Sequence, residues 1–278
     1  MVEQLTENRD CATRWPLFLV HGIAIKQAER LRYWGRIPET LRQRGATVCI
    51  SRQDAWGSAE SNAQQLRTRL FEILQEQQTD KVNIIGHSKG GIDARVLATL
   101  PGCAEHIASI TTIATPHHGA RGLDWIYHVP SPIKWLAGLP VDIALILLGE
   151  DNPHYVQAWE GVGAKAMEEF NQRYPLPKDI PLQSYAAVQN RLPGDLFFLT
   201  ITPLVLLLEG PNDGLVPQHS AQYGDFKGTI NAEGRLGLSH IECSDTGRSP
   251  RARKLSRDGF DVLAWWVELV RDLKSRGY

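Results

Sequence analysis

The sequence predicts an α/β fold with a mostly parallel central sheet flanked by helices. Short apolar runs alternate three times with amphipathic segments between residues 16 and 114. A serine flanked by glycines, in Gly86-His87-Ser88-Lys89-Gly90, stands where one such run gives way to a helix-like segment. Alternating strands and helices form parallel sheets with right-handed crossovers, and the chemistry of such sheets lies at the carboxyl ends of the strands. We therefore expect the site at the edge where His21, Ser88 and Thr115 follow predicted strands.

Each predicted strand is an apolar run, and each predicted helix carries apolar residues at three- and four-residue steps. The unbroken apolar run from Pro16 to Val20 indicates a strand buried on both faces. Gly45 stands in the position that helices favour for a C-terminal cap. The expected strands are 16–20, 46–51, 81–85, 107–114, 183–188 and 224–230, and the expected helices are 30–44, 59–78, 91–100 and a terminal helix that carries Phe260, Leu263, Val267 and Val270.

One domain, residues 1–278, is expected, with a cap inserted at about 120–180. The alternation breaks there, and residues 141–148 form an apolar helix candidate that no sheet position accounts for. A cap over the active site and an ordinary helical subdomain packed on the sheet explain this segment equally well. The apolar run 196–208 is expected to form a helix that walls a pocket.

Composition and charge exclude several classes of protein. The 278 residues are 42% hydrophobic, and 30 basic against 31 acidic side chains give a formal charge of -1. A net charge so close to zero gives no indication of binding to nucleic acid or to an anionic membrane. The four cysteines lack C-x-x-C spacing, so we expect free thiols, no metal site and no cofactor. No run reaches the roughly 20 apolar residues of a membrane span. The polar start favours the cytoplasm, or secretion if a leader has been removed.

Ser88 is the predicted nucleophile. A G-x-S-x-G sequence between a buried strand and a helix is typical of a sharp turn that holds the serine hydroxyl above the sheet. Gly86 and Gly90 let strand and helix pass closely. The first turn of the following helix offers unpaired backbone N–H groups that can bind a developing oxyanion.

A serine hydroxyl needs a base to take its proton and an acid to orient the base. For a serine on such a turn the chain order is serine, acid, histidine. His240 lies in a small-residue loop after the last predicted strand, where a base is normally presented, and is preferred over the other downstream histidines. Asp213, in the turn sequence Pro211-Asn212-Asp213-Gly214, is the preferred acid. The rival acids are Asp195, Asp225 and Asp245.

The oxyanion hole is expected to use two backbone amides. Gly22, just after the first inner strand, lets the chain turn so that the Ile23 N–H faces Ser88. The second donor is the N–H of Lys89. Each such donor contributes about 3 kcal/mol of transition-state stabilisation. We expect the Lys89 side chain itself to contribute little to the rate.

Four stretches together resemble the bacterial triacylglycerol lipases of the Pseudomonas and Burkholderia type, which are α/β-hydrolases. The stretches are Val20 to Ile23, Ile84 to Gly91, Thr111 to Gly119 and Asn212 to Val216. The likeness is strong over residues 16–120 and patchy over 205–245. It implies an α/β-hydrolase fold with Ser88 as nucleophile, Asp213 as acid, His240 as base and an oxyanion hole of Ile23 and Lys89. It also implies an ester substrate with a long acyl chain.

Two departures from that family bear on metals. Those lipases hold a structural calcium partly through an aspartate two residues past the catalytic histidine and a glutamine further on. Glu242 and Thr246 occupy those places here, so we do not predict calcium. The adjacent His117 and His118 fall in a turn after a strand, where the resemblance makes a histidine ordinary, so we predict no zinc there either.

The sequence thus predicts a serine hydrolase that cleaves carboxylic esters of lipid-like substrates through an acyl-enzyme intermediate. Its expected partners are a lipid or ester substrate, with transient contact between the cap and a lipid interface. Two rivals stay open: a thioesterase or polyester depolymerase on the same triad, and a non-catalytic lipid-binding protein that keeps the fold.

Overall fold

The fold is built on one parallel six-stranded sheet, ordered β2-β1-β3-β4-β5-β6. The structure is a computed structural model that describes residues 9–23, 33–121, 124, 128–133, 139, 161–190, 202–246 and 259–278. The strands are β1 (Leu17–Val20), β2 (Val48–Ile50), β3 (Val82–His87), β4 (Ile107–Ile113), β5 (Leu182–Ala187) and β6 (Asp225–Ile230).

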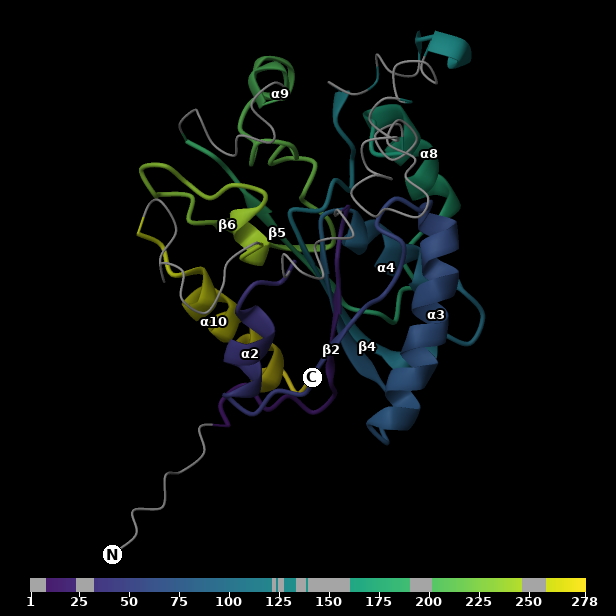
Figure 1. The fold of residues 1–278 in the computed structure, drawn as a ribbon, viewed down its shortest axis with the longest axis vertical. Helices are drawn as coiled ribbons and strands as arrows, with labels where there is room; N and C mark the ends of the chain where they lie inside the picture. The colour runs from purple at the N-terminus through teal and green to yellow at the C-terminus, as the bar shows by residue number, and fades with distance from the viewer. Residues whose placement is uncertain are drawn as a thin grey trace, which may run out of the picture.

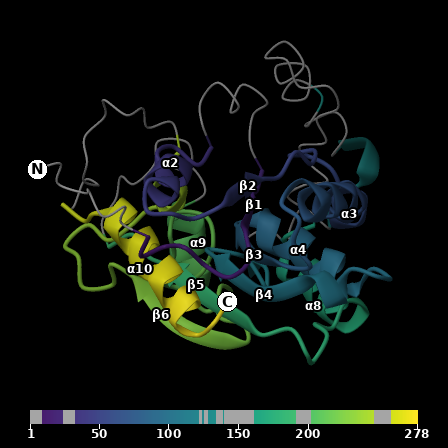
Figure 2. The same cartoon turned by 90° about the horizontal axis from the view of Figure 1, so that it is seen from below.

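Helices cover both faces of the sheet. On one face lie α2 (Ile37–Arg42) and α10 (Val262–Ser275), and on the other lie α3 (Ala59–Glu76) and α4 (Lys89–Thr99), as Figures 1 and 2 show. Each face has its own apolar core: Leu17, Leu19 and Trp266 belong to the first, whereas Phe18, Val20 and Leu66 belong to the second. Alternate residues of β1 therefore point into opposite cores, as the period of two in a strand requires.

The chain reverses its direction across the sheet between β1 and β3. It runs from β1 outward to β2 and then returns to β3 on the other side of β1, with Val20 in register with Gly86. In open parallel sheets such a switch point leaves a crevice at the carboxyl ends of the two strands. The turn after β1 and the turn after β3 therefore meet, which brings Gly22 beside Ser88.

The predicted strands and most predicted helices are confirmed, with shifted ends. The clearest error is the first helix: residues 33–36 form turns, and α2 begins only at Ile37, with Pro38 in its first turn. Gly35, within these turns, has a φ of +44°, which lies outside the helical range. Strand β3 runs on to His87 and α4 begins at Lys89, so only Ser88 lies between strand and helix.

About half of the proposed cap, residues 120–180, falls outside the described residues, and the helix candidate 141–148 falls there entirely. Within 161–190 the chain forms α8 (Ala164–Arg173) before β5. The described part of the run 196–208, residues 202–208, belongs to α9 (Thr202–Glu209). The division into one domain with a cap thus stays a prediction. Among the helices that the structure describes, none combines the length and the apolar character that a bilayer crossing needs.

Candidate active site

Ser88 stands alone between β3 and α4 in a strained conformation. Its φ is 55° and its ψ is -133°. Backbone angles of this kind are rare for a residue with a side chain and are maintained only where the surroundings enforce them. Here they are enforced by close packing: a Cβ at Gly90 would lie 2.2 Å from the Val20 carbonyl oxygen, and one at Gly86 would lie 2.7 Å from the Gly91 Cα. The two glycines therefore let α4 sit against β1 and β3.

The structure brings together the three residues predicted as a triad. His240 Nδ1 lies 2.7 Å from Asp213 Oδ2, and His240 Nε2 lies 2.9 Å from Ser88 Oγ. All three are buried. A carboxylate only accepts, so Nδ1 carries the proton, and Nε2 is free to accept from the Ser88 hydroxyl. This arrangement equips Nε2 to remove the serine proton.

The loop of Asp213 holds both the acid and the main chain of the base. Asp213 Oδ1 accepts hydrogen bonds from the amides of Leu215 and Val216, at 3.0 and 2.7 Å. The Asp213 carbonyl accepts from the His240 amide at 2.9 Å. The turn sequence thus forms the Asx-type bonds typical of an aspartate in a turn, while the other carboxylate oxygen remains available to the imidazole. Asp213 can therefore stabilise the turn through Oδ1 and orient His240 through Oδ2 at the same time.

The rival acids lie elsewhere or outside the described residues. Asp225 is paired with Lys227 at the surface, 2.6 Å away. Asp245 is fully buried and binds Arg36 through both oxygens, with Nη2 to Oδ1 at 2.7 Å and Nε to Oδ2 at 2.9 Å. Asp195 belongs to the segment that is not described.

Side-chain hydrogen bonds fix the orientation of the peptide groups in the turn after β1. Gln53 Nε2 donates to the His21 carbonyl at 2.8 Å. The His21 imidazole bonds the Gly22 carbonyl through Nδ1 at 2.9 Å, which makes Nδ1 the protonated nitrogen. Because the Gly22 carbonyl shares its peptide plane with the Ile23 N–H, this contact also sets the direction of that N–H. Burial lowers the pKa of His21, so the ring acts as a neutral donor.

Contact between this turn and Ser88 is tight. A Cβ at Gly22 would lie 2.7 Å from the Ser88 Cβ. Lys89 begins α4, so its N–H belongs to the helix turn whose amides have no acceptor within the helix. The two predicted donors, Ile23 and Lys89, therefore belong to the two turns that meet at Ser88.

The environment of Lys89 was not predicted from the sequence. Its Nζ donates to Asp93 Oδ1 and Oδ2 at 2.8 and 3.0 Å, and Asn62 donates to the same carboxylate at 2.7 Å. The Lys89 and Asp93 side chains are 7% and 1% exposed. Burial raises the pKa of Asp93, and Lys89 opposes that rise. The lysine side chain is therefore part of a buried ion pair within the first turns of α4.

His117 is a packing residue in the described surroundings. Its Nε2 lies 2.9 Å from Thr112 Oγ1, its Nδ1 lies 3.3 Å from Arg95 Nη1, and its ring stacks on Tyr223 at 4.7 Å. Burial, with the nearby Arg95, lowers the pKa of His117 well below its usual range. Across the residues that the structure describes, no three histidine, cysteine, aspartate or glutamate side chains converge as metal ligands.

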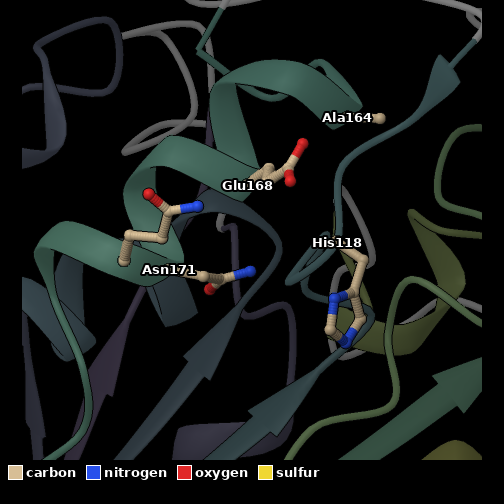
Figure 3. A pocket seen from close by; sticks show the side chains of 5 residues that line it. His118, Ala164, Glu168 and Asn171 are labelled. Carbon is tan, nitrogen blue, oxygen red and sulfur yellow. The ribbon is translucent and has the colours of Figure 1, made fainter.

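A pocket of about 310 Å³ lies between α8 and the turn after β4. It is lined by His118 on one side and by Ala164, Glu168 and Asn171 of α8 on the other, as Figure 3 shows. None of the predicted triad or oxyanion residues lines it, and α9 contributes no lining residue. The expectation that the run 196–208 walls a pocket remains untested, because residues 191–201 are not described.

Comparison with known proteins points to lipases and esterases. Residues 64–128, which include β3, Ser88 and β4, match the model of the PGAP1-like alpha/beta domain. A triacylglycerol lipase of Pseudarthrobacter phenanthrenivorans is 36% identical over 123 residues, which make up 42% of this chain and 38% of that protein. A triacylglycerol lipase of Vibrio cholerae is 27% identical over 246 residues, covering 79% of this chain and 78% of that protein.

Solved structures agree on the fold. A metagenomic carboxyl esterase superposes with a TM-score of 0.73 at 17% identity, covering 94% of this chain and 76% of that one. The chain spans less than two-fifths of the length of the Pseudarthrobacter relative. The similarity to triacylglycerol lipases is confirmed, and the chain has the α/β-hydrolase fold.

Proposed function

We propose that the protein is a serine hydrolase that cleaves carboxylic esters of lipid-like substrates. The observation that carries this proposal is the continuous line of contacts from Asp213 Oδ2 through the His240 imidazole to Ser88 Oγ, at 2.7 and 2.9 Å. An incidental serine in a turn would have no histidine at hydrogen-bond distance, and an incidental histidine would have no carboxylate on its other nitrogen. The named lipase and esterase relatives support the same reaction.

Each step of the reaction has a residue to perform it. His240 Nε2 takes the proton of Ser88, whose Oγ attacks the ester carbonyl carbon. The oxyanion that forms is bound by the amides of Ile23 and Lys89, while Asp213 keeps the imidazolium oriented. His240 then gives the proton to the leaving alcohol, and the acyl group stays on Ser88. Water, deprotonated by the same Nε2, releases the acid and restores the serine.

A lipid-like substrate is favoured by relatives and by surface chemistry. The curated relatives are named triacylglycerol lipases. Helix α9 ends at Glu209, just before the loop of Asp213, and exposes Leu206, Leu207 and Leu208, of which Leu207 is 82% exposed. A run of exposed leucines in the helix that leads into the Asp213 loop suits an apolar acyl chain or a lipid surface better than a small polar ester.

The experiment that tests the proposal is a rate profile on p-nitrophenyl esters from acetate to palmitate, with a triglyceride emulsion alongside. We expect activity that extends to long chains and to the emulsion, and a loss of roughly 10⁴- to 10⁶-fold in Ser88→Ala. Activity confined to acetate and butyrate would reduce the protein to an esterase of small substrates. Equal rates for the wild type and Ser88→Ala would overturn the serine mechanism and leave a non-catalytic lipid-binding protein. Faster cleavage of the matched acyl thioester would make it a thioesterase.

A further inference from the structure

Two side chains outside the triad join the turn after β1 to the main chain of His240. The Gly22 N–H lies 2.9 Å from the Tyr33 hydroxyl oxygen. That oxygen lies 2.5 Å from His87 Nδ1. His87 Nε2 lies 3.1 Å from the carbonyl oxygen of His240. Together these contacts run from the turn that carries Ile23 to the residue that contacts Ser88 through its imidazole.

The donor at one end, the Gly22 N–H, and the acceptor at the other, the His240 carbonyl, determine the direction of every hydrogen bond between them. A backbone carbonyl only accepts, so His87 Nε2 carries a hydrogen and donates to His240. In a neutral imidazole, Nδ1 is then an acceptor, and the Tyr33 hydroxyl donates to it. The Tyr33 oxygen in turn accepts from the Gly22 N–H, which can only donate. Every donor in this chain of hydrogen bonds therefore faces an acceptor, and His87 must be the tautomer that carries its hydrogen on Nε2.

The surroundings keep His87 neutral and in place. Its side chain is buried, and burial together with the neighbouring His240 lowers its pKa well below the usual range. Rings pack on it from three sides: Tyr33 at 5.7 Å, Trp34 at 6.3 Å and His240 at 4.8 Å between centroids. Burial also raises the pKa of the Tyr33 phenol, so the hydroxyl keeps its proton.

We propose that Tyr33 and His87 are positioning residues that couple the oxyanion turn to the catalytic base. The proposal rests on the function proposed above, since it assigns a role within that site. Tyr33 holds the His21–Gly22 peptide through the Gly22 N–H, next to the peptide that carries the Ile23 donor. His87 holds the His240 carbonyl, while the Asp213 carbonyl holds the His240 amide. The oxyanion donor and the base are thus set relative to each other by one chain of hydrogen bonds through Tyr33 and His87.

Tyr33→Phe is the direct test, because it removes one oxygen and keeps the ring. The Gly22 N–H and His87 Nδ1 both lose their partner, so the oxyanion turn is held less firmly. Since that turn acts in the transition state, we expect kcat to fall about tenfold with KM changed less than about twofold. Active sites are counted by titration with a p-nitrophenyl alkylphosphonate, and Tm is measured in parallel, so that a loss of folded enzyme is not mistaken for a loss of rate.

Tyr185→Phe is the matched control. Tyr185 is partly buried on β5 with its ring edge-on to Trp265, so the substitution removes the same atom from a comparable environment. We expect its kcat per titrated site to equal that of the wild type. If Tyr33→Phe behaves like Tyr185→Phe, with its effect confined to Tm or to the titrated fraction, Tyr33 is a packing residue and the proposal is wrong.

A second pair of variants at His87 tests the other end of the chain. His87→Gln keeps an N–H donor at the reach of Nε2, whereas His87→Phe keeps only the ring. We expect His87→Gln to retain several times more kcat per titrated site than His87→Phe. Equal losses in the two would show that the bond to the His240 carbonyl does not matter. These outcomes are distinct from failure of the proposed function, which Ser88→Ala reports: an inactive Ser88→Ala with a fully active Tyr33→Phe refutes the positioning role alone.

Discussion

Lys89 and Asp93 form a buried ion pair one helical turn apart, with Nζ 2.8 Å from Oδ1, in the helix that begins directly after Ser88. The pair lies at the start of α4, where the Lys89 amide is the predicted oxyanion donor. Lys89 therefore has two separate features: an ammonium group that pairs with Asp93, and a backbone N–H that is the predicted oxyanion donor. A substitution of the side chain removes the first and keeps the second.

Lys89→Gln should lower stability far more than it lowers the rate per folded molecule. The substitution leaves Asp93 buried with Asn62 as its remaining side-chain donor. Removing one partner of a buried ion pair typically costs about 3–5 kcal/mol. The backbone N–H is unchanged, so kcat per titrated site should stay within about threefold. Urea unfolding and phosphonate titration separate the two effects. A stable Lys89→Gln with a collapsed kcat would show that the ammonium acts in catalysis.

The same variant should respond to pH in a defined direction. Burial already holds the pKa of Asp93 above its ordinary value, and loss of Lys89 removes a group that lowers it. A carboxyl whose folded pKa exceeds its unfolded pKa lowers stability above that pKa and ceases to do so once protonated. The stability deficit of Lys89→Gln should therefore shrink as the pH falls through the raised pKa. Lys89→Gln/Asp93→Asn, which carries no charge at either position, should show no such pH dependence and should recover part of the stability.

Asp213→Asn should lose far more activity than Asp225→Asn. Asp213 Oδ2 orients the His240 imidazole, and an amide in its place either loses this acceptor or favours the wrong tautomer, at a cost of about 10⁴-fold in kcat in the serine-protease example. Asp225 is exposed and paired with Lys227 at the surface, so its variant should match the wild type. Near-wild-type kcat in Asp213→Asn would mean that another group is the acid.

Asp245→Asn should reduce stability while leaving the chemistry intact in the folded molecule. Its carboxylate is 0% exposed and binds the Arg36 side chain twice and the Arg36 amide once, at 2.8 Å. An asparagine leaves the guanidinium underpaired in a buried place, at a cost of roughly 3 kcal/mol or more. Thermal unfolding and kcat per titrated site at low temperature check both parts. A large loss of kcat in folded Asp245→Asn would assign this aspartate to the active site after all.

Gly22→Ala should impair the rate through a direct clash. The added methyl group would lie 2.7 Å from the Ser88 Cβ, closer than two such atoms can approach, so one of the two turns must move. We expect kcat to fall by about 10²-fold, the effect of a lost oxyanion donor. Gly102→Ala is the control: it adds a methyl at a φ of +74° but meets no atom within 4 Å, so it should reduce stability without reducing kcat. Equal kcat in the two variants would exclude the clash.

The parts of the site that sequence could predict are those with local signatures. Ser88 follows from its flanking glycines and the strand-to-helix context, and Asp213 follows from a turn sequence between apolar runs. His240 was placed by chain order and loop character. For these three the structure shows the expected proximity, while their roles remain proposals.

The parts that sequence could not predict depend on contacts between distant segments. His87 lies next to Ser88 in the chain, yet its partners are Tyr33 and the carbonyl of His240, which is 153 residues away. Sequence periodicity cannot predict contacts between segments so far apart. Lys89 pairs with Asp93 at helical spacing, but its burial depends on how α3 packs on α4. The first helix was predicted too long because its apolar steps continue through turns, although Pro38 marks where α2 begins.

The hydrogen bond that the Ser88 hydroxyl donates to His240 spans 152 residues and requires the sheet to be complete up to β6. A chain synthesised only as far as β4 contains the serine and its turn but lacks both acid and base. Such a nascent chain cannot hydrolyse esters, however well its first four strands have folded. Recovery of activity during refolding should therefore follow the docking of the last strand and its loops, which makes ester hydrolysis a reporter of complete folding.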